Sequence, residues 1–126
     1  MSIVNVRSKL KIDNSGLLPI KYMFSGFECI NLVKHQFDFY NGLRVTMRPP
    51  AVPCKVGVHI NTSIKEYEHF VGNLVDTENP RKEWVQYEIP LAIMSNNFIQ
   101  SSLIGAPVED IFHMKGVSFH VEKQNN

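Results

Sequence analysis

Hydrophobic residues recur at every second position in five short segments of this chain, and this alternation constrains the fold more than any other feature. The segments are residues 9–13, 43–48, 54–61, 84–89 and 117–122. Such alternation is typical of half-buried antiparallel strands, which turn one face toward a core and the other toward water. Turn-forming residues separate the segments, at positions 13–16, 41–42, 48–53 and 78–81. About seven or eight short strands at this spacing predict a β-sandwich or barrel.

Helix is expected in two places only. A turn or two is predicted over residues 91–97 and another over residues 108–112, each directly after a proline, which suits the first turn of a helix. We therefore expect an all-β jelly-roll β-sandwich of two antiparallel sheets with at most two short helices. Neither a linker nor a repeat divides the chain, so residues 1–126 are predicted to form one domain, with residues 122–126 as a frayed tail.

The alternation also predicts which side chains fill the core. The residues expected to be almost fully buried are Val45, Val56, Val58, Ile89, Val117 and Phe119. The two cysteines, Cys29 and Cys54, lie in apolar strand patterns, which favour free buried thiols over a disulfide. Free buried thiols in turn favour a reducing compartment.

Charge and hydropathy argue against nucleic-acid binding and against a membrane-spanning helix. The chain has 13 basic and 12 acidic residues, a net charge of +1, whereas a nucleic-acid-binding protein would carry a concentrated basic surface. Its apolar runs are far shorter than the roughly 18 residues that a membrane-spanning helix requires. The first residues hold no hydrophobic signal-peptide segment. We therefore expect neither nucleic acid as a partner nor a direct membrane span.

The distribution of histidines and nucleophiles does not indicate an enzyme. The five histidines show neither the His-x-His nor the His-x-x-x-His spacing of a local metal site. Phe24-Ser25-Gly26-Phe27 does not fit the pattern of a nucleophile elbow. The prediction is a non-catalytic protein without cofactor or metal. A site assembled from distant strands stays open, because spacing along the chain does not test it.

Trp84 is the start of a possible binding surface. It is out of phase with the apolar residues that follow it, so its ring either forms a platform on the outer face or packs between the sheets, as a sandwich tryptophan commonly does. Polar side chains on other strands would complete a binding face if those strands are neighbours. The candidate binding face comprises Arg44, Arg48, His59, Asn61, Tyr67, Trp84 and Gln86.

Five segments of the chain form an ordered series of short motifs. They are Phe24-Ser25-Gly26, Asp38-Phe39-Tyr40-Asn41-Gly42-Leu43-Arg44-Val45, residues 54–62, Trp84-Val85-Gln86-Tyr87-Glu88-Ile89-Pro90-Leu91 and residues 114–121. In this order they resemble the motifs of the complex I intermediate-associated protein 30 family, whose fold is a galactose-binding-domain-like jelly roll. Two features depart from the family. Its opening segment with Trp and Gly-Gly-Ser has no counterpart, and Pro49-Pro50-Ala51-Val52-Pro53 replaces its glycine-rich turn. Prolines supply few backbone donors, so a ligand bound by that turn in relatives is not expected here.

The resemblance implies a function that no single residue establishes. It implies a protein-interaction module that serves as an assembly factor or accessory subunit of mitochondrial respiratory complex I. Its partners would be other protein subunits of this large membrane complex. It would be mitochondrial, although no targeting peptide is visible, and otherwise cytoplasmic. The alternative is a carbohydrate-binding module that uses the candidate face. The single tryptophan and the absence of a secretion signal argue against that alternative.

Overall fold

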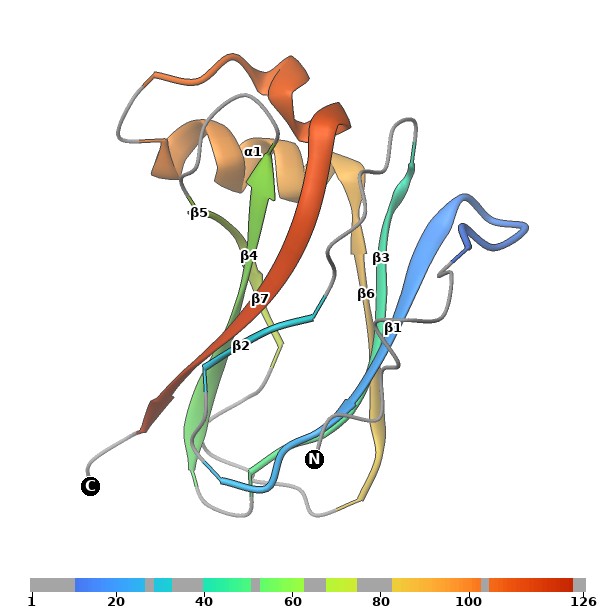
Figure 1. Ribbon diagram of the computed structural model, residues 1–126, viewed down its shortest axis with the longest axis vertical. Helices are drawn as coiled ribbons and strands as arrows, with labels where there is room; N and C mark the ends of the chain where they lie inside the picture. Colours follow the sequence, from blue (N-terminus) through green and yellow to red (C-terminus); the bar gives the residue numbers. More distant parts are fainter. Residues whose placement is uncertain are drawn as a thin grey trace.

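The computed structural model describes residues 11–26, 29–32, 40–50, 53–62, 68–74, 83–102 and 105–123. Two β-sheets pack face to face, and two helical segments lie together at one end of the sandwich (Figure 1). The prediction of an all-β sandwich with at most two short helices is confirmed.

The first sheet has three strands in the order β1-β3-β6. Its strands are β1 (Leu17–Met23), β3 (Gly42–Arg48) and β6 (Val85–Pro90). The central strand, β3, is antiparallel to β6 but parallel to β1. Leu43, Val45 and Met47 point from β3 into the core, while the residues between them face outward.

The second sheet has four strands in the order β2-β7-β4-β5 and is antiparallel throughout. Its strands are β2 (Ile30–Asn31), β7 (Met114–Lys123), β4 (Cys54–Thr62) and β5 (Glu68–Asn73). The alternating burial along β4 places Val56, Val58 and Ile60 inside and the intervening residues outside.

The parallel pairing of β1 with β3 differs from the expected antiparallel arrangement. Between these two strands the chain forms β2, which belongs to the opposite sheet. A chain that leaves a sheet by such a crossover can re-enter it in its original direction, whereas a tight hairpin would reverse it. The crossover through β2 in the second sheet therefore explains why β1 and β3 are parallel.

The two helical segments are α1 (Leu91–Ser101) and η1 (Val108–His113), both at the positions predicted from the prolines before them. The Asn97 side-chain amide donates to the Val71 carbonyl at 3.0 Å, and the Ser101 hydroxyl donates to the Phe70 carbonyl at 3.2 Å. Both acceptors lie in β5, the edge strand of its sheet, so α1 covers that edge. In the part of the chain that the structure describes, neither helix is long and apolar enough to cross a bilayer.

The prediction of the six core residues is confirmed. All six residues expected in the core are at most 5% exposed. Three aromatic rings pack together in the core, those of Tyr22, Phe24 and Phe119. The ring centroids are 4.8 Å apart for Tyr22 and Phe24, and 5.8 Å apart for Phe24 and Phe119. Phe119 lies in β7 and Tyr22 in β1, so this aromatic cluster joins the two sheets.

Two local predictions were wrong, and one strand was not predicted. Residues 11–13, the described part of the first alternating segment, precede a turn and belong to no strand. The first strand among the described residues, β1, was not predicted because Pro19 interrupts its alternation. At the edge of a sheet, proline is tolerated. The expected frayed tail is shorter than predicted, because β7 pairs as far as Lys123. Residues 124–126 lie outside the described residues.

Removal of the Phe119 ring tests the packing between the sheets. We expect Phe119→Ala to lower the free energy of unfolding by about 3–5 kcal/mol, because it leaves a cavity beside two aromatic rings. Chemical denaturation measures the change. Ile99→Ala is the control, since Ile99 is 58% exposed on α1. Wild-type stability of Phe119→Ala would contradict the observed register of β7.

Candidate functional site

The residues predicted to form one binding face lie on opposite sides of the sandwich. Arg44, Arg48 and Gln86 project from the outer surface of the three-stranded sheet. His59 and Asn61 project from the outer surface of the four-stranded sheet, because β4 pairs with β5 and β7 rather than with β3 or β6. The described strands therefore do not unite these residues. Tyr67 lies outside the described residues.

On the three-stranded sheet, Arg44 is engaged by two carboxylates. Its Nε donates to Glu88 at 2.9 Å, and its guanidinium also contacts the Asp13 carboxylate. Asp13 in turn accepts hydrogen bonds from the Ser15 hydroxyl and from the Ser15 and Leu17 backbone amides. The Ser15 hydrogen bond lowers the pKa of Asp13, which keeps the carboxylate charged. Arg44 thus fastens the turn before β1 to the sheet.

Trp84 does not pack between the sheets. Its side chain is 40% exposed, and the Lys21 ammonium lies 5.0 Å from the centre of its ring. This distance is typical of a cation–π contact. The alternative that Trp84 packs between the sheets, as a sandwich tryptophan commonly does, is therefore wrong. Its ring is available at the surface, beside a lysine.

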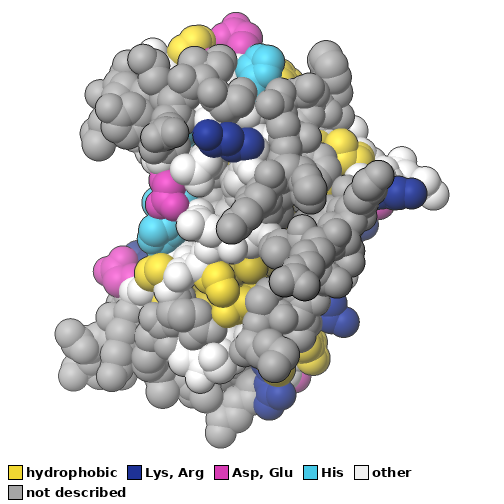
Figure 2. Space-filling model, viewed as in Figure 1, with side chains coloured by type: hydrophobic (Ala, Val, Ile, Leu, Met, Phe, Trp, Pro, Cys, Tyr) yellow, Lys and Arg dark blue, Asp and Glu magenta, His cyan; other side chains and the backbone are white. Residues whose placement is uncertain are grey.

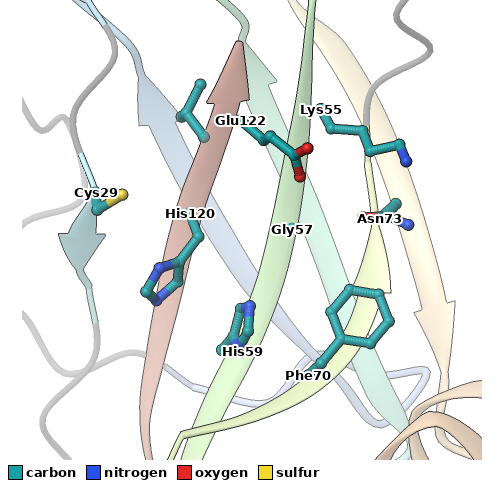
Figure 3. Close-up of a pocket in the computed structure, with 9 residues that line it drawn as sticks. Cys29, Lys55, Gly57, His59, Phe70, Asn73, His120 and Glu122 are labelled. Carbon is teal, nitrogen blue, oxygen red and sulfur yellow. The ribbon is translucent and has the colours of Figure 1, made fainter. Parts of the chain in front are cut away.

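The outer surface of the four-stranded sheet carries a hollow of about 240 Å³. It is lined by Cys29, Lys55, Gly57, His59, Phe70, Asn73, His120, Val121 and Glu122 (Figure 3). In the space-filling view, histidine and acidic side chains gather on the left flank of the molecule, where the surface is indented (Figure 2). Polar and titratable groups from β4, β5 and β7 thus converge here.

Gly57 forms the floor of the hollow. It pairs with His120 on β7 and with Asn73 on β5, so larger side chains surround a position that has none. A methyl group at Gly57 would lie 3.6 Å from the His59 ring nitrogen Nε2 and 3.8 Å from the Asn73 side-chain oxygen. Because these are ordinary contact distances, a longer side chain at Gly57 would occupy the space that the glycine leaves open.

Three side chains at this hollow and its border place potential metal ligands close together. His59, His120 and Glu68 each offer one donor atom, and the three atoms all lie within 4.8 Å of one another. The His120 Nε2 is 2.7 Å from a Glu68 carboxylate oxygen, and the two imidazole rings have centroids 4.3 Å apart. Figure 3 shows the two imidazoles side by side on β4 and β7.

The surroundings of His59 favour its neutral form. Partial burial lowers its pKa, and the neighbouring His120 lowers it further, while the Glu68 carboxylate partly opposes both effects. A neutral imidazole keeps a lone pair that can accept a proton or bind a metal ion. At neutral pH, therefore, His59 is available as a ligand.

The two cysteines occupy different surroundings. Cys54 is a buried free thiol, as predicted, whereas Cys29 is a free thiol exposed at the hollow. The prediction that both would be buried was wrong for Cys29, because that residue precedes the two-residue strand β2 rather than lying in a core strand.

A second polar cluster is buried at the helical end of the sandwich. Thr62, His69 and Asp110 are each at most 2% exposed. Within the described residues, the Thr62 hydroxyl, the His69 Nε2 and one Asp110 carboxylate oxygen have no hydrogen-bond partner. Burial lowers the pKa of His69, an effect that the Asp110 charge partly opposes. The His69 ring also packs on Phe98, with centroids 4.3 Å apart.

Sequence reasoning placed His59 and His120 on outward positions of their strands but missed their proximity. They belong to strands far apart in sequence, and only the pairing of β4 with β7 makes them diagonal neighbours. Outward histidines on two separate strands were the available signal, and the strand order was the missing information.

The buried histidine predicts a loss of stability in mild acid. The unfolded chain protonates His69 near pH 6.5, whereas the folded protein binds that proton only at lower pH. The stability linked to this residue is therefore complete above pH 6.5 and is lost as the pH falls below it. We expect the melting temperature to fall between pH 7.5 and pH 5, and to fall less in His69→Gln. The non-titrating control Asn73→Gln should keep the wild-type pH dependence. Identical pH dependence in wild type and His69→Gln would contradict this account.

Comparisons with family models, with curated proteins and with solved structures give no match to this chain.

Proposed function

We propose that this protein is a non-catalytic interaction module that binds other protein chains as an accessory subunit or assembly factor of a larger complex. The observation that carries the proposal is the outer surface of α1. This surface is exposed and apolar in part, and the helix contains no charged residue.

The exposed surface of α1 has the composition of a protein interface. Ile93 is 51% exposed and Ile99 is 58% exposed, while Met94 and Phe98 fill the core side of the same helix. A helix that faces only solvent normally carries charged residues on its outer side. Depletion of charge combined with exposed apolar side chains is typical of the centre of a protein–protein interface.

The edge of the adjoining strand extends this surface. Among the described strands, β6 pairs only with β3, and α1 begins directly after β6 ends at Pro90. An edge strand offers backbone donors and acceptors to a partner strand. A partner that covers α1 therefore has hydrogen-bonding groups of β6 within reach.

The identity of the larger complex rests on the motif resemblance alone. On that resemblance we propose mitochondrial respiratory complex I, with the chain bound to other subunits of that membrane complex. If the protein is not mitochondrial, the proposal of a protein-binding module still holds for a cytoplasmic complex.

A carbohydrate-binding module is a second candidate, favoured by the exposed ring of Trp84. An exposed aromatic ring can stack on a sugar. However, Lys21 lies over this ring. Arg44 pairs with Glu88, four residues along the chain from Trp84, and is held by Asp13 and Glu88. His59 and Asn61 lie on the other sheet. The polar groups expected to assist the tryptophan are thus already engaged or distant, which makes protein binding the better-supported proposal.

Two charges placed on α1 test the proposal. We expect Ile93→Lys with Ile99→Lys to leave the melting temperature nearly unchanged, because both side chains are largely exposed. The double variant should lose at least about tenfold of the co-purifying partner chains, because charges in the centre of an interface are strongly unfavourable. Affinity purification followed by sizing of the recovered complexes measures the loss.

The matched control is Glu83→Lys, which adds the same net charge before the opposite end of β6. It should recover the partners at the wild-type level. Undiminished recovery by the α1 double variant would overturn the proposed interface. Recovery of a polysaccharide ligand, lost on Trp84→Ala, would favour the carbohydrate candidate. Co-migration with any complex other than complex I would overturn only the finer identification.

A further inference from the structure

We propose that His59, His120 and Glu68 form a binding site for a divalent transition-metal ion of the Zn²⁺ class, on the outer surface of the four-stranded sheet. This inference is independent of the interface on α1. It rests on the donor atoms of the three side chains, on the rigidity of the strands that hold them and on the space above Gly57.

The donor set fits zinc better than calcium or magnesium. Two imidazole nitrogens and one carboxylate are the protein ligands of many zinc sites with an open position, at about 2.0–2.2 Å from the ion. Calcium and magnesium prefer shells made entirely of oxygen ligands. The three donor atoms lie within 4.8 Å of one another, so small side-chain rotations bring them around one ion.

The strands that carry the ligands are paired and therefore hold them in place. His59 pairs with Ser118, two residues before His120 on β7, and with Phe70, two residues after Glu68 on β5. Glu68 on β5 and His120 on β7 are thus diagonal neighbours of His59, one on each side of β4. A change of register after Val58 alters the pairing of β4 with β5 next to His59. Such bulges commonly re-aim side chains beside functional sites.

The charges around the site are compatible with a bound cation. Glu68 supplies a negative charge in contact with His120. Lys55 also lines the hollow, and the acidic residue Glu122 lines it from the opposite position on β7.

The open space beside the ligands leaves room for a fourth ligand. Gly57 contributes no side chain, and the hollow of about 240 Å³ is several times larger than a water molecule. Three protein ligands with an accessible fourth position are typical of sites where water or an external group completes the coordination. The proposed site would therefore hold an exchangeable ligand rather than a fully enclosed structural ion.

The competing explanation is a surface ion pair between His120 and Glu68 that has no affinity for metal. The two explanations differ in what His59 does. An ion pair does not need His59, whereas a metal site loses one of three ligands when His59 is replaced. Variants of His59 therefore discriminate between them.

Calorimetric titration of the chelator-treated full chain with ZnCl₂ at pH 7.5 tests the site. We expect one ion per chain, with no comparable heat from CaCl₂ or MgCl₂. His59→Gln, His120→Gln and Glu68→Gln should each weaken zinc binding at least about tenfold. The control His113→Gln, a histidine exposed at the end of η1, should bind as the wild type does. Circular dichroism verifies that each variant is folded.

Cobalt provides a second readout that does not depend on affinity. CoCl₂ bound to two imidazoles and a carboxylate should give visible absorption bands of a low-coordinate site, and these bands should disappear in His59→Gln. Absence of zinc binding would overturn the proposal. Zinc binding that persists undiminished in His59→Gln and Glu68→Gln would also overturn it, because the ion would then occupy another part of the chain.

Discussion

The pairing of β4 with β7 is the constraint on which the rest of the structure depends. It is a long antiparallel ladder that begins with Cys54 opposite Lys123 and ends with Thr62 opposite Met114. Its inner side supplies Val58 and Phe119 to the core, where the Phe119 ring packs near the Tyr22 ring of the other sheet. Its outer side places His59 beside His120. One set of backbone hydrogen bonds thus fixes both the packing between the sheets and the geometry of the candidate metal site.

The sequence correctly predicted which residues of a strand face the core, but it did not predict which strands are neighbours. A period of two reveals which residues point inward, so the buried positions on β3, β4, β6 and β7 followed from local pattern. Strand order depends on crossovers that leave no local mark. For that reason the parallel pairing of β1, the separation of Arg44 from His59 and the proximity of His59 to His120 all required the structure. Pro19 concealed β1 for a different reason, since a pattern cannot show that a strand lies at an edge.

Outward-facing residues of this protein divide into three kinds of environment. Arg44 is engaged with Asp13 and Glu88, which gives it a structural role between a turn and two strands. His59 lies at an open hollow beside other titratable side chains, where its imidazole could bind a ligand. The outer surface of α1 has neither charges nor a described partner, and its apolar residues remain in contact with water. Outward-facing residues therefore form a structural ion-pair cluster around Arg44, a candidate ion site at His59 and a candidate interface on α1.

The crossover that makes β1 parallel to β3 also bears on how the chain reaches this structure. Among the described strand pairs, only β4 and β5 follow one another directly in sequence. Strand β3 pairs with the much later β6, and β4 pairs with the still later β7. Each such pairing closes a long loop before its contacts form, and topologies dominated by distant pairings fold in milliseconds to seconds. During synthesis, β4 and β5 are exposed before β7 has been made. The outer rows of charged and polar side chains on these strands, including Lys55 and Glu68, then discourage association with other chains until the final strand docks.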